Sequence, residues 1–476
     1  MNRPVHPLFL AFWQRATLYA IIPRMPNRKF IPIALLIIVY FVAAGLYAAL
    51  TPPWQAPDEP AHYNYIRQLA EGDFPVIEAG DYDQAYQAMA IDARFDGYDV
   101  SEFEYEDWQP PLYYLIQTPF FLLSDGDLLV LRLVSVVMGA GVVLLAYRIA
   151  RMLLLEEQKY LALGIAAFVA LVPQHVAVLA SVNNDALAEL LIAAILYVLV
   201  GWLTYVNPRA RRAVSSRLWW LGVLLGLGLL TKGTVYLMVP VVAGAMLWLY
   251  WGNWSGLGWA AVRTLGPAFL LGAIWWVRNI LVYNGLDPLA MAAHNDVVLG
   301  QPRTSEWVAT YGFWGVVWRF LRTTFNSFWG QFGWMAAPLP GWMYLVLVLF
   351  TLVTLGGLIY LLATRRSLVD RPLNPTEIRE VGQAQRIGVM MAALFGLTLL
   401  LYLGYNLTYV QHQGRYLFPA LIPMGLGLGL AWGTLLRPVV VRYPPLRYAF
   451  PIGLTAVLFS LSLLALFTTV IPRLSP

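Results

Sequence analysis

The sequence predicts an all-α polytopic membrane protein, and three observations support this prediction. The 476 residues are 59% hydrophobic and only 12% charged, whereas a soluble domain carries about 25% charged residues. The 19 tryptophans and 27 tyrosines fit the aromatic belts that form at membrane–water interfaces. Apolar runs of about 20 residues, the length that crosses a bilayer as a helix, recur along the chain.

We predict eleven membrane-spanning helices from these runs. They lie near residues 30–50, 128–150, 160–180, 186–206, 217–231, 234–251, 258–283, 341–363, 387–409, 415–436 and 448–471. The first run is longer than the apolar stretch of a cleavable signal peptide, which is about 7–15 residues. We therefore expect an uncleaved first helix, preceded by a basic cytoplasmic segment over residues 1–29.

Residues 111–123 are apolar but short for a span, and prolines stand at their start and at Pro119. If they crossed the membrane, the arginines between residues 209 and 217 would face outward. An interfacial or re-entrant helix would instead leave every basic cluster on the cytoplasmic side. The positive-inside rule favours the interfacial or re-entrant helix.

This topology divides the chain into four parts and predicts a multi-pass cell-membrane protein with a cytoplasmic N-terminus. After segment 1–29 comes a first transmembrane module, residues 30–283, which includes an acidic outer loop at 51–127. A second large outer loop covers 284–340, and residues 341–476 form the C-terminal helices. The turn at 181–185 and the segment 408–415 also face outward. The basic clusters are short and adjoin apolar spans, so they do not indicate a nucleic-acid partner.

The first outer loop is strongly acidic. Fourteen of the chain's 26 Asp and Glu residues lie between Thr51 and Pro110, with only Arg67 and Arg94 as basic residues. Within this loop, residues 61–71 have helical spacing and Gly72 follows as a stop signal. We expect short helices along the membrane surface here, and amphipathic stretches such as 306–320 in the second outer loop.

Asp58 and Glu59 begin this loop where the first span ends, and His62 follows one helical turn later. Acidic residues at such a position usually face water, a partner charge or a substrate. The group suits a general base oriented by its neighbours or part of a metal site. Alternatively, Asp58 is an ordinary helix N-cap followed by a proline.

Two further outer segments carry candidate substrate-binding residues. Gln109 and Tyr113 belong to Gln109-Pro-Pro-Leu-Tyr-Tyr114, where the prolines either present these side chains or only stiffen the return toward the bilayer. Asn184 and Asp185 lie in a polar turn between two apolar spans, and Glu189 follows one turn into the helix. These polar residues either contribute to a site or simply form the turn.

Two outer-face cations are candidates for binding a phosphate. Lys232 lies between two spans where the charge rule disfavours a lone cation, although lysine can also extend its ammonium group to the interface. Arg415 begins a helix after Gly414 and presents a planar, permanently charged guanidinium. His412, Gln413 and Tyr416 accompany it as further candidate substrate contacts.

The order of these features resembles the GT-C superfamily. The resemblance rests on the acidic pair, on Pro110-Pro-Leu-Tyr-Tyr114, on Leu131-Arg-Leu-Val-Ser135 and on Leu229-Leu-Thr-Lys-Gly233. GT-C proteins are membrane glycosyltransferases that use polyprenyl-phosphate-linked sugars, and they include protein O-mannosyltransferases and lipid A aminoarabinose transferases.

Two strings, Pro57-Asp-Glu-Pro-Ala-His62 and Gln413-Gly-Arg-Tyr-Leu-Phe-Pro419, are closer still to a bacterial branch of predicted membrane proteins of unassigned function. The resemblance implies a GT-C-like bundle of about eleven transmembrane helices, with a long first extracytoplasmic loop that carries short interfacial helices. It also implies that Asp58 is the catalytic carboxylate, assisted by Glu59. The sequence has Gln109-Pro-Pro where the mannosyltransferases have His-Pro-Pro, and its acidic loop is long, so the sugar and the acceptor stay open.

We therefore expect a glycosyltransferase that moves a sugar from a polyprenyl-phosphate donor to an acceptor hydroxyl on a lipid, glycan or protein. Lys232 and Arg415 would stabilise the leaving phosphate. If the 181–185 turn folds against the first loop, Asp58, His62 and Asp185 would suit Mg²⁺ or Mn²⁺. The alternatives are a transporter or flippase of lipid-linked glycans, and a ligase that transfers whole glycans.

Overall fold

The computed structural model describes residues 31–205, 211–364 and 374–476. The predicted cytoplasmic segment 1–29 lies outside these ranges, as do Arg209 and Arg366 of the basic clusters. The described chain is helical apart from one hairpin of two short strands, β1 (Gln331–Phe332) and β2 (Ala337–Pro338). The all-α prediction is confirmed.

Among the described residues, eight helices are long and apolar enough to cross a membrane, or nine if one bent pair counts as a span. They are α2 (Ile31–Leu50), α6 (Leu128–Leu153), α9 (Asp185–Tyr205), α12 (Trp254–Val282), α15 (Gly341–Thr364), α16 (Pro375–Thr408), α17 (Leu421–Arg442) preceded by η6 (Gly414–Ala420), and α18 (Ala449–Ala465) continued by η8 (Leu466–Val470) and α19 (Ile471–Leu474). The length and composition of the described helices therefore do not confirm the predicted count of eleven.

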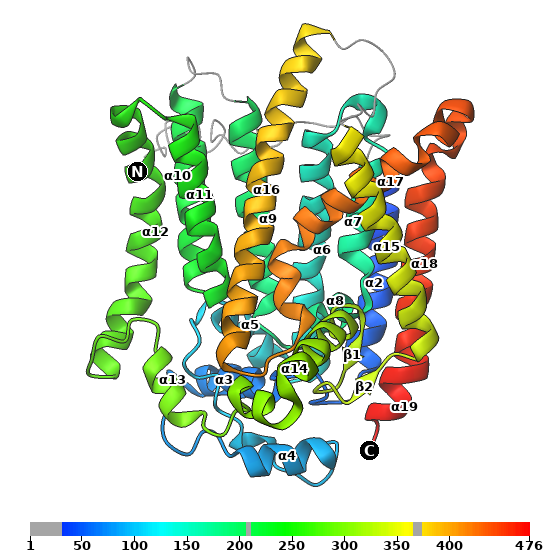
Figure 1. Cartoon of the computed structure of the whole chain (residues 1–476). Coiled ribbons are helices and arrows are strands. Elements are labelled where there is room, and N and C mark those ends of the chain that lie inside the picture. The colour runs from blue at the N-terminus through cyan, green and yellow to red at the C-terminus, as the bar shows by residue number, and fades with distance from the viewer. Residues whose placement is uncertain (1–30, 206–210, 365–373) are drawn as a thin grey trace, which may run out of the picture.

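The difference in the count comes partly from the predicted spans 217–231 and 234–251. The first corresponds to α10 (Arg211–Leu229), whose first turns are polar and carry arginines, which lowers its hydropathy. The second corresponds to η5 (Gly233–Leu237) and α11 (Met238–Leu249), which together are too short to rank as a span. Both run alongside α12 and α9 in Figure 1.

The predicted single span at 160–180 is instead two helices, α7 (Leu161–Leu171) and α8 (Pro173–Leu179), which meet at 63°. Pro173 has no N–H, so it cannot donate to the carbonyl of Val169 four residues earlier. His175 Nδ1 lies 2.6 Å from that carbonyl oxygen and takes the place of the missing donor. His175 Nε2 in turn lies 2.5 Å from the Glu189 carboxylate of α9, so the bend is tied to the neighbouring span.

The helices of the acidic loop agree with the sequence analysis. α3 (Glu59–Glu71) ends at Gly72, whose φ of 98° gives the left-handed cap, with its N–H directed at the carbonyls of Gln68 and Leu69. α5 (Leu112–Ser124) is a short apolar helix of 13 residues that packs against α3 and α6 and is too short to rank as a span.

The acidic loop also has a small hydrophobic core of its own. α4 (Gln84–Asp92) and η3 (Val100–Glu102) are its other helical elements. Ile77, Phe95, Phe103 and Tyr105 are buried in this core together with Val298 from the second outer loop. The acidic loop and the loop over residues 284–340 therefore pack together.

The second outer loop contains α13 (Met291–Val297), α14 (Thr304–Trp329) and the hairpin. The predicted amphipathic stretch 306–320 is the first part of α14, which is kinked at Gly312, where φ is 70°. Figure 1 shows α3, α4, α13 and α14 gathered at one end of the bundle, opposite the start of α10. Two 3₁₀ turns, η4 (Glu156–Gln158) and η7 (Pro444–Tyr448), complete the described elements.

The first prediction concerns membrane sidedness. Because the chain has no cysteine, single cysteines placed at residues 73, 211 and 415 report accessibility to a membrane-impermeant thiol reagent. We expect positions 73 and 415 to label from one side of the membrane and position 211 from the other. Labelling of positions 211 and 415 from the same side would contradict the topology.

The second prediction concerns the pH dependence of stability. Asp107 is 2% exposed, and its Oδ1 has no hydrogen-bond partner; burial raises its pKa to about 8. The folded state therefore prefers the protonated form of Asp107. This preference contributes its full stabilisation at pH values below the unfolded pKa of about 3.9. The stabilisation is lost as the pH rises through the folded pKa of about 8. Asp107→Asn removes the ionisable group.

We expect the thermal unfolding midpoint of the detergent-solubilised wild type to fall between pH 6 and pH 9, and that of Asp107→Asn to fall less. The exposed Asp73 provides the matched control variant, Asp73→Asn, which should keep the wild-type profile. Identical profiles for wild type and Asp107→Asn would show that Asp107 does not carry this dependence.

Candidate functional site

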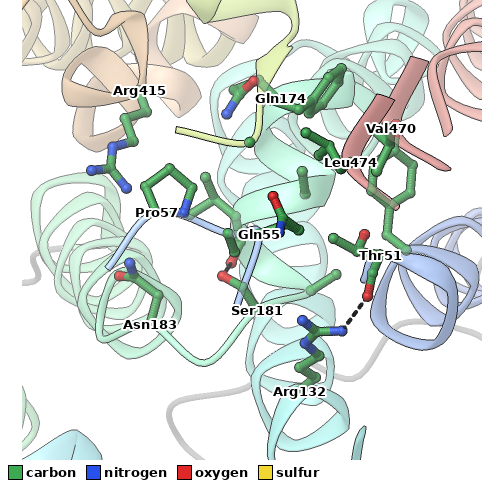
Figure 2. Close-up of a pocket in the computed structure, with 17 residues that line it drawn as sticks. Thr51, Gln55, Pro57, Arg132, Gln174, Ser181, Asn183, Arg415, Val470 and Leu474 are labelled. Atoms are coloured by element: carbon green, nitrogen blue, oxygen red, sulfur yellow. Dashed lines mark hydrogen bonds between the residues drawn. The ribbon is translucent and has the colours of Figure 1, made fainter. Parts of the chain in front are cut away.

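A buried arginine fixes the acidic pair at the end of the first span. Arg132 of α6 donates through Nε to Glu59 Oε1 at 2.8 Å and through Nη2 to Oε2 at 2.6 Å. The same guanidinium donates to the carbonyls of Ala48, Thr51 and Pro52, at the end of α2 and just beyond it. Figure 2 shows the contact between Arg132 and Thr51. Arg132 therefore holds both sides of the turn that leads to Asp58.

The carboxylate of Glu59 has no oxygen free for a substrate. Besides Arg132, it accepts hydrogen bonds from the backbone N–H groups of Trp54 at 3.2 Å and Val182 at 3.1 Å. Its side chain is completely buried. The resemblance implies that Glu59 assists Asp58. The geometry gives it a positioning role, because it connects the start of the acidic loop to α6 and to the 181–185 turn.

Asp58 is not a conventional helix cap. Its φ of 68° puts it in the left-handed region, and its side chain accepts no capping hydrogen bond from α3, which excludes the N-cap alternative. The carboxylate instead accepts from Arg415 Nη2 at 2.7 Å and from the Tyr105 hydroxyl at 3.1 Å. A positive φ strains the backbone of a residue other than glycine, and such strained conformations are common at functional sites.

A second ion pair lies beside the first. Lys232 Nζ is 2.6 Å from Asp185 Oδ1. The charges of Arg415 and Lys232 both act on Asp58, and both also act on Asp185. Burial would raise the pKa of Asp58, but the Arg415 guanidinium opposes it and, with other nearby groups, holds that pKa below its usual range. Two carboxylates and two cations from four separate segments thus form one cluster.

The polar groups next to this cluster are connected by hydrogen bonds. Asn184 Nδ2 donates to Gln109 Oε1 and to the Tyr114 hydroxyl, both at 3.3 Å. His62 Nδ1 lies 2.8 Å from the same hydroxyl. Burial lowers the pKa of His62 to about 3, so its imidazole is neutral. These contacts bring three predicted site residues, Gln109, Asn184 and His62, into one buried network.

Tyr113 is fully buried, and its hydroxyl contacts Ser135 at 2.9 Å and accepts from the Asn183 N–H at 3.0 Å. Packing encloses the whole ring, which gives Tyr113 a structural role; its predicted contact with substrate stays a prediction. Tyr113 fixes the 181–185 turn against α5.

The segment before Arg415 aims its guanidinium. Gln413 Oε1 accepts from Arg415 Nε at 2.8 Å, and the Tyr416 ring centroid lies 5.6 Å from the guanidinium carbon. A Cβ at Gly414 would lie 2.4 Å from the backbone of Phe328, so only glycine allows this approach to α14. Gln413 and Tyr416 thus contact Arg415 of the cluster, and their contact with substrate stays a prediction.

His412 is not at the cluster. Its ring makes edge-to-face contacts with Trp307 and Phe320 of α14, at centroid distances of 5.5 and 5.3 Å, and the residue is 6% exposed. These aromatic contacts hold the His412 side chain against α14, and its predicted contact with substrate stays a prediction. His412 docks the 409–415 segment onto α14.

The proposed metal set is not assembled. Across residues 31–205, 211–364 and 374–476, no three His, Cys, Asp or Glu side chains form a group able to hold a metal ion. Asp58 and Asp185 each face a cation, and His62 bonds to Tyr114. The ligand set Asp58, His62 and Asp185 for Mg²⁺ or Mn²⁺ is therefore corrected, because ion pairing already satisfies both carboxylates.

A pocket that is partly open to solvent adjoins the Arg415 side of the cluster. Its wall is polar near Arg415, Asn183 and Gln174 and apolar near Val470 and Leu474 (Figure 2). Arg132 lines the same pocket. A ligand with an anionic head and an apolar tail matches this division.

Three residues at the site were missed by the sequence analysis. The sequence does contain evidence for a role of Arg132. It is the only charged residue between 128 and 147, and an arginine within a span requires a partner. Nothing in the sequence distinguishes Tyr105 and Glu106, since they lie among many similar residues of the acidic loop.

The third prediction tests the positioning role of Glu59. Removing one partner of a buried ion pair costs about 3–5 kcal/mol, because the other charge stays buried without a partner. We expect Glu59→Gln to lower the thermal unfolding midpoint strongly. The exposed pair of Glu156 and Lys159 provides the control, where Glu156→Gln should change stability by under about 1 kcal/mol. Equal midpoints for Glu59→Gln and wild type would contradict the role.

The sequence model of the dolichyl-phosphate-mannose-protein mannosyltransferase family matches residues 108–276, about a third of the chain. No curated protein sequence matches the chain significantly. The matched region contains Gln109, Arg132, the 181–185 turn and Lys232.

Solved structures of two proteins match nearly the whole chain. The oligosaccharyltransferase of Archaeoglobus fulgidus, in complex with Zn and sulfate, has a TM-score of 0.52 at 12% identity, over 90% of this chain and 52% of its own. ArnT from Cupriavidus metallidurans bound to undecaprenyl phosphate has a TM-score of 0.50 at 14% identity, over 94% of this chain and 74% of its own.

The S. cerevisiae protein O-mannosyltransferase complex bound to the sugar donor aligns less well, with a TM-score of 0.41 at 17% identity over 56% of this chain. This chain spans 35% of the yeast protein and about half of the archaeal one. The two longer alignments establish the architecture that the motif order indicated. The chain is a multi-pass membrane protein with the fold of the GT-C glycosyltransferases, and its central third matches the protein mannosyltransferase family.

Proposed function

We propose that this protein is a glycosyltransferase that transfers a sugar from a polyprenyl-phosphate donor to an acceptor hydroxyl on the extracytoplasmic side of the membrane. The observation that carries the proposal is the cluster in which Asp58 pairs with Arg415 beside the pair of Asp185 and Lys232. This cluster adjoins a pocket with an apolar wall. The similarity to ArnT, a protein solved with undecaprenyl phosphate, adds support.

The donor phosphate binds to Arg415 and Lys232. In the free protein each cation is neutralised by a carboxylate, which avoids two unpaired charges next to the membrane. An arriving phosphate competes for the same guanidinium and ammonium, since charge-assisted bonds to phosphate are strong. Binding therefore weakens the contact between Arg415 and Asp58 and frees the carboxylate when the donor is present.

Asp58 then acts as the general base. It removes the proton of the acceptor hydroxyl while the acceptor oxygen bonds to the sugar's anomeric carbon and the bond from that carbon to the phosphate oxygen breaks. The displacement inverts the anomeric centre. Arg415 and Lys232 stabilise the negative charge that develops on the leaving phosphate. The Tyr105 hydroxyl orients the carboxylate.

We also propose eleven spans, with α10 and α11 among them, a cytoplasmic N-terminus, and the four-part division at residues 29, 283 and 340. The aqueous end that carries α3, α4, α13 and α14 would then be extracytoplasmic. The acceptor is a lipid, a glycan or a protein that approaches from this side.

The fourth prediction distinguishes the role of Asp58 as general base from the role of Arg415 in binding the donor phosphate. Asp58→Asn keeps the shape of the side chain and removes its basicity, so turnover of a radiolabelled lipid-phosphosugar should fall by about 10²–10⁴ with donor binding nearly intact. Arg415→Ala should mainly weaken donor binding, and Arg415→Lys should restore only part of it because the planar fork is lost.

A flippase or transporter would give a different result. Lipid-linked sugar would then move normally in Asp58→Asn, and wild type would form no glycosylated product. A ligase would instead transfer a whole lipid-linked oligosaccharide and show no turnover of the single-sugar donor. Either outcome would overturn the proposal, whereas full activity of Asp58→Asn in an active enzyme would only move the base elsewhere.

A further inference from the structure

Glu106 lies in the turn just before α5, and the residues on both sides of it reach the charged cluster. The Tyr105 hydroxyl donates a hydrogen bond to the Asp58 carboxylate at 3.1 Å. Gln109 accepts from Asn184 through its side chain, and its backbone N–H donates to the Glu106 carbonyl at 2.9 Å. The turn is therefore held against the site at two points, with Glu106 between them.

The carboxyl group of Glu106 differs from the other carboxylates near the site. Asp58, Glu59 and Asp185 each face a cation, namely Arg415, Arg132 and Lys232. In the part of the chain that the structure describes, Glu106 has no ion pair, and its Oε2 is buried without a hydrogen-bond partner. Gln109 is its side-chain hydrogen-bond partner. An ionised carboxylate with an unsatisfied buried oxygen would be costly, so the neutral acid suits this position.

The charges that act on Glu106 come from every element around it. The charged and titratable groups that face it are Asp58, Tyr105, Asp107, Tyr114, Lys232, Tyr405 and Arg415. Burial, with the nearby charge of Asp58, raises the pKa of Glu106 to about 8, although Lys232 and Arg415 oppose the increase. Glu106 is thus protonated at neutral pH while Asp58, whose pKa is lowered, is ionised.

Two carboxyl groups held in opposite protonation states at one site can divide acid and base work between them. We propose that Glu106 is the general acid of the transfer reaction and protonates the departing phosphate oxygen, while Asp58 accepts the proton of the acceptor hydroxyl. The inference rests on the proposed function, because it assigns a second residue to the same reaction.

The proton and bond changes balance. The acceptor O–H bond breaks and its proton goes to Asp58, the acceptor oxygen bonds to the anomeric carbon, and the bond between that carbon and the phosphate oxygen breaks. The Glu106 carboxyl proton passes to the released phosphate oxygen. Proton transfer from Asp58 to Glu106, directly or through water, restores the starting state without any further reactant.

The position of Glu106 agrees with this role. Lys232 and Arg415, the two cations assigned to the phosphate, are among the charges that act on it. A phosphate held by these cations would give the unpaired Oε2–H a hydrogen-bond acceptor. The negative charge of the phosphate would also favour the protonated acid until the bond breaks.

The test is the pH dependence of kcat/KM with a lipid-phosphosugar donor. A general acid is active when protonated, so the rate should be retained at lower pH and should fall as the pH rises through about 8. Glu106→Gln should lower kcat by about 10²–10⁴ and remove this alkaline decline. A rate that instead rises through the same range and depends on Glu106 would assign it as a base and overturn the proposal.

A donor with a less basic leaving group provides a second measurement. The phosphorothioate analogue of the donor needs less protonation of its leaving group, so the difference between wild type and Glu106→Gln should shrink with it. The wild-type alkaline decline should shrink as well, which keeps the proposal testable if Glu106→Gln does not fold. An equal loss with both donors, or an unchanged decline, would contradict acid catalysis.

Glu104 supplies the matched control. It lies two residues away, is partly exposed and pairs with Arg67, so Glu104→Gln should keep wild-type activity and its pH profile. If Glu106→Gln matches wild type while Asp58→Asn is inactive, the inference fails and the proposed function stands. If wild type transfers no sugar from any lipid-phosphosugar, the proposed function itself fails.

Discussion

The buried ion pair of Arg132 and Glu59 is the contact on which the arrangement of the site depends. It joins the end of α2, the start of α3 and the 181–185 turn to α6, with Glu59 also accepting from the Val182 N–H. A buried pair of this kind is not necessarily more stable than a well-packed apolar contact. Its effect is to specify geometry, because each of its hydrogen bonds fixes a backbone segment that leads to a site residue.

One consequence is the conformation of Asp58. The residue before a fully anchored Glu59 has little freedom, and at φ 68° its carboxylate points away from the helix that it precedes. It meets Arg415, which Gln413 holds from the other side. Each carboxylate of the cluster pairs with a cation, so none of these four charges is left unpaired in the free protein. Under the proposed function, a phosphate would bind by exchange with these carboxylates.

The bent pair α7–α8 applies the same principle inside the bundle. Pro173 leaves the Val169 carbonyl without a helical donor, and His175 supplies one while contacting Glu189. Because Gln174 and Ala177 of α8 line the pocket, the bend contributes to the pocket wall. A straight helix over 160–180, as the apolar run alone suggested, would have moved these side chains.

The sequence by itself determined the features that depend on local chemistry. Apolar length predicts membrane helices, and Gly72 ends α3 because glycine adopts positive φ readily. The charge distribution predicts which segments share one end of the bundle, and the motif order indicated the GT-C fold. Only the tertiary structure decided which charges meet: Arg415 and Asp58 are 357 residues apart, and Arg132 and Glu59 are 73 apart. Ion pairing depends on distance in space, which no local pattern encodes, so Glu59 and His412 had the sequence context of site residues while packing gave them structural roles.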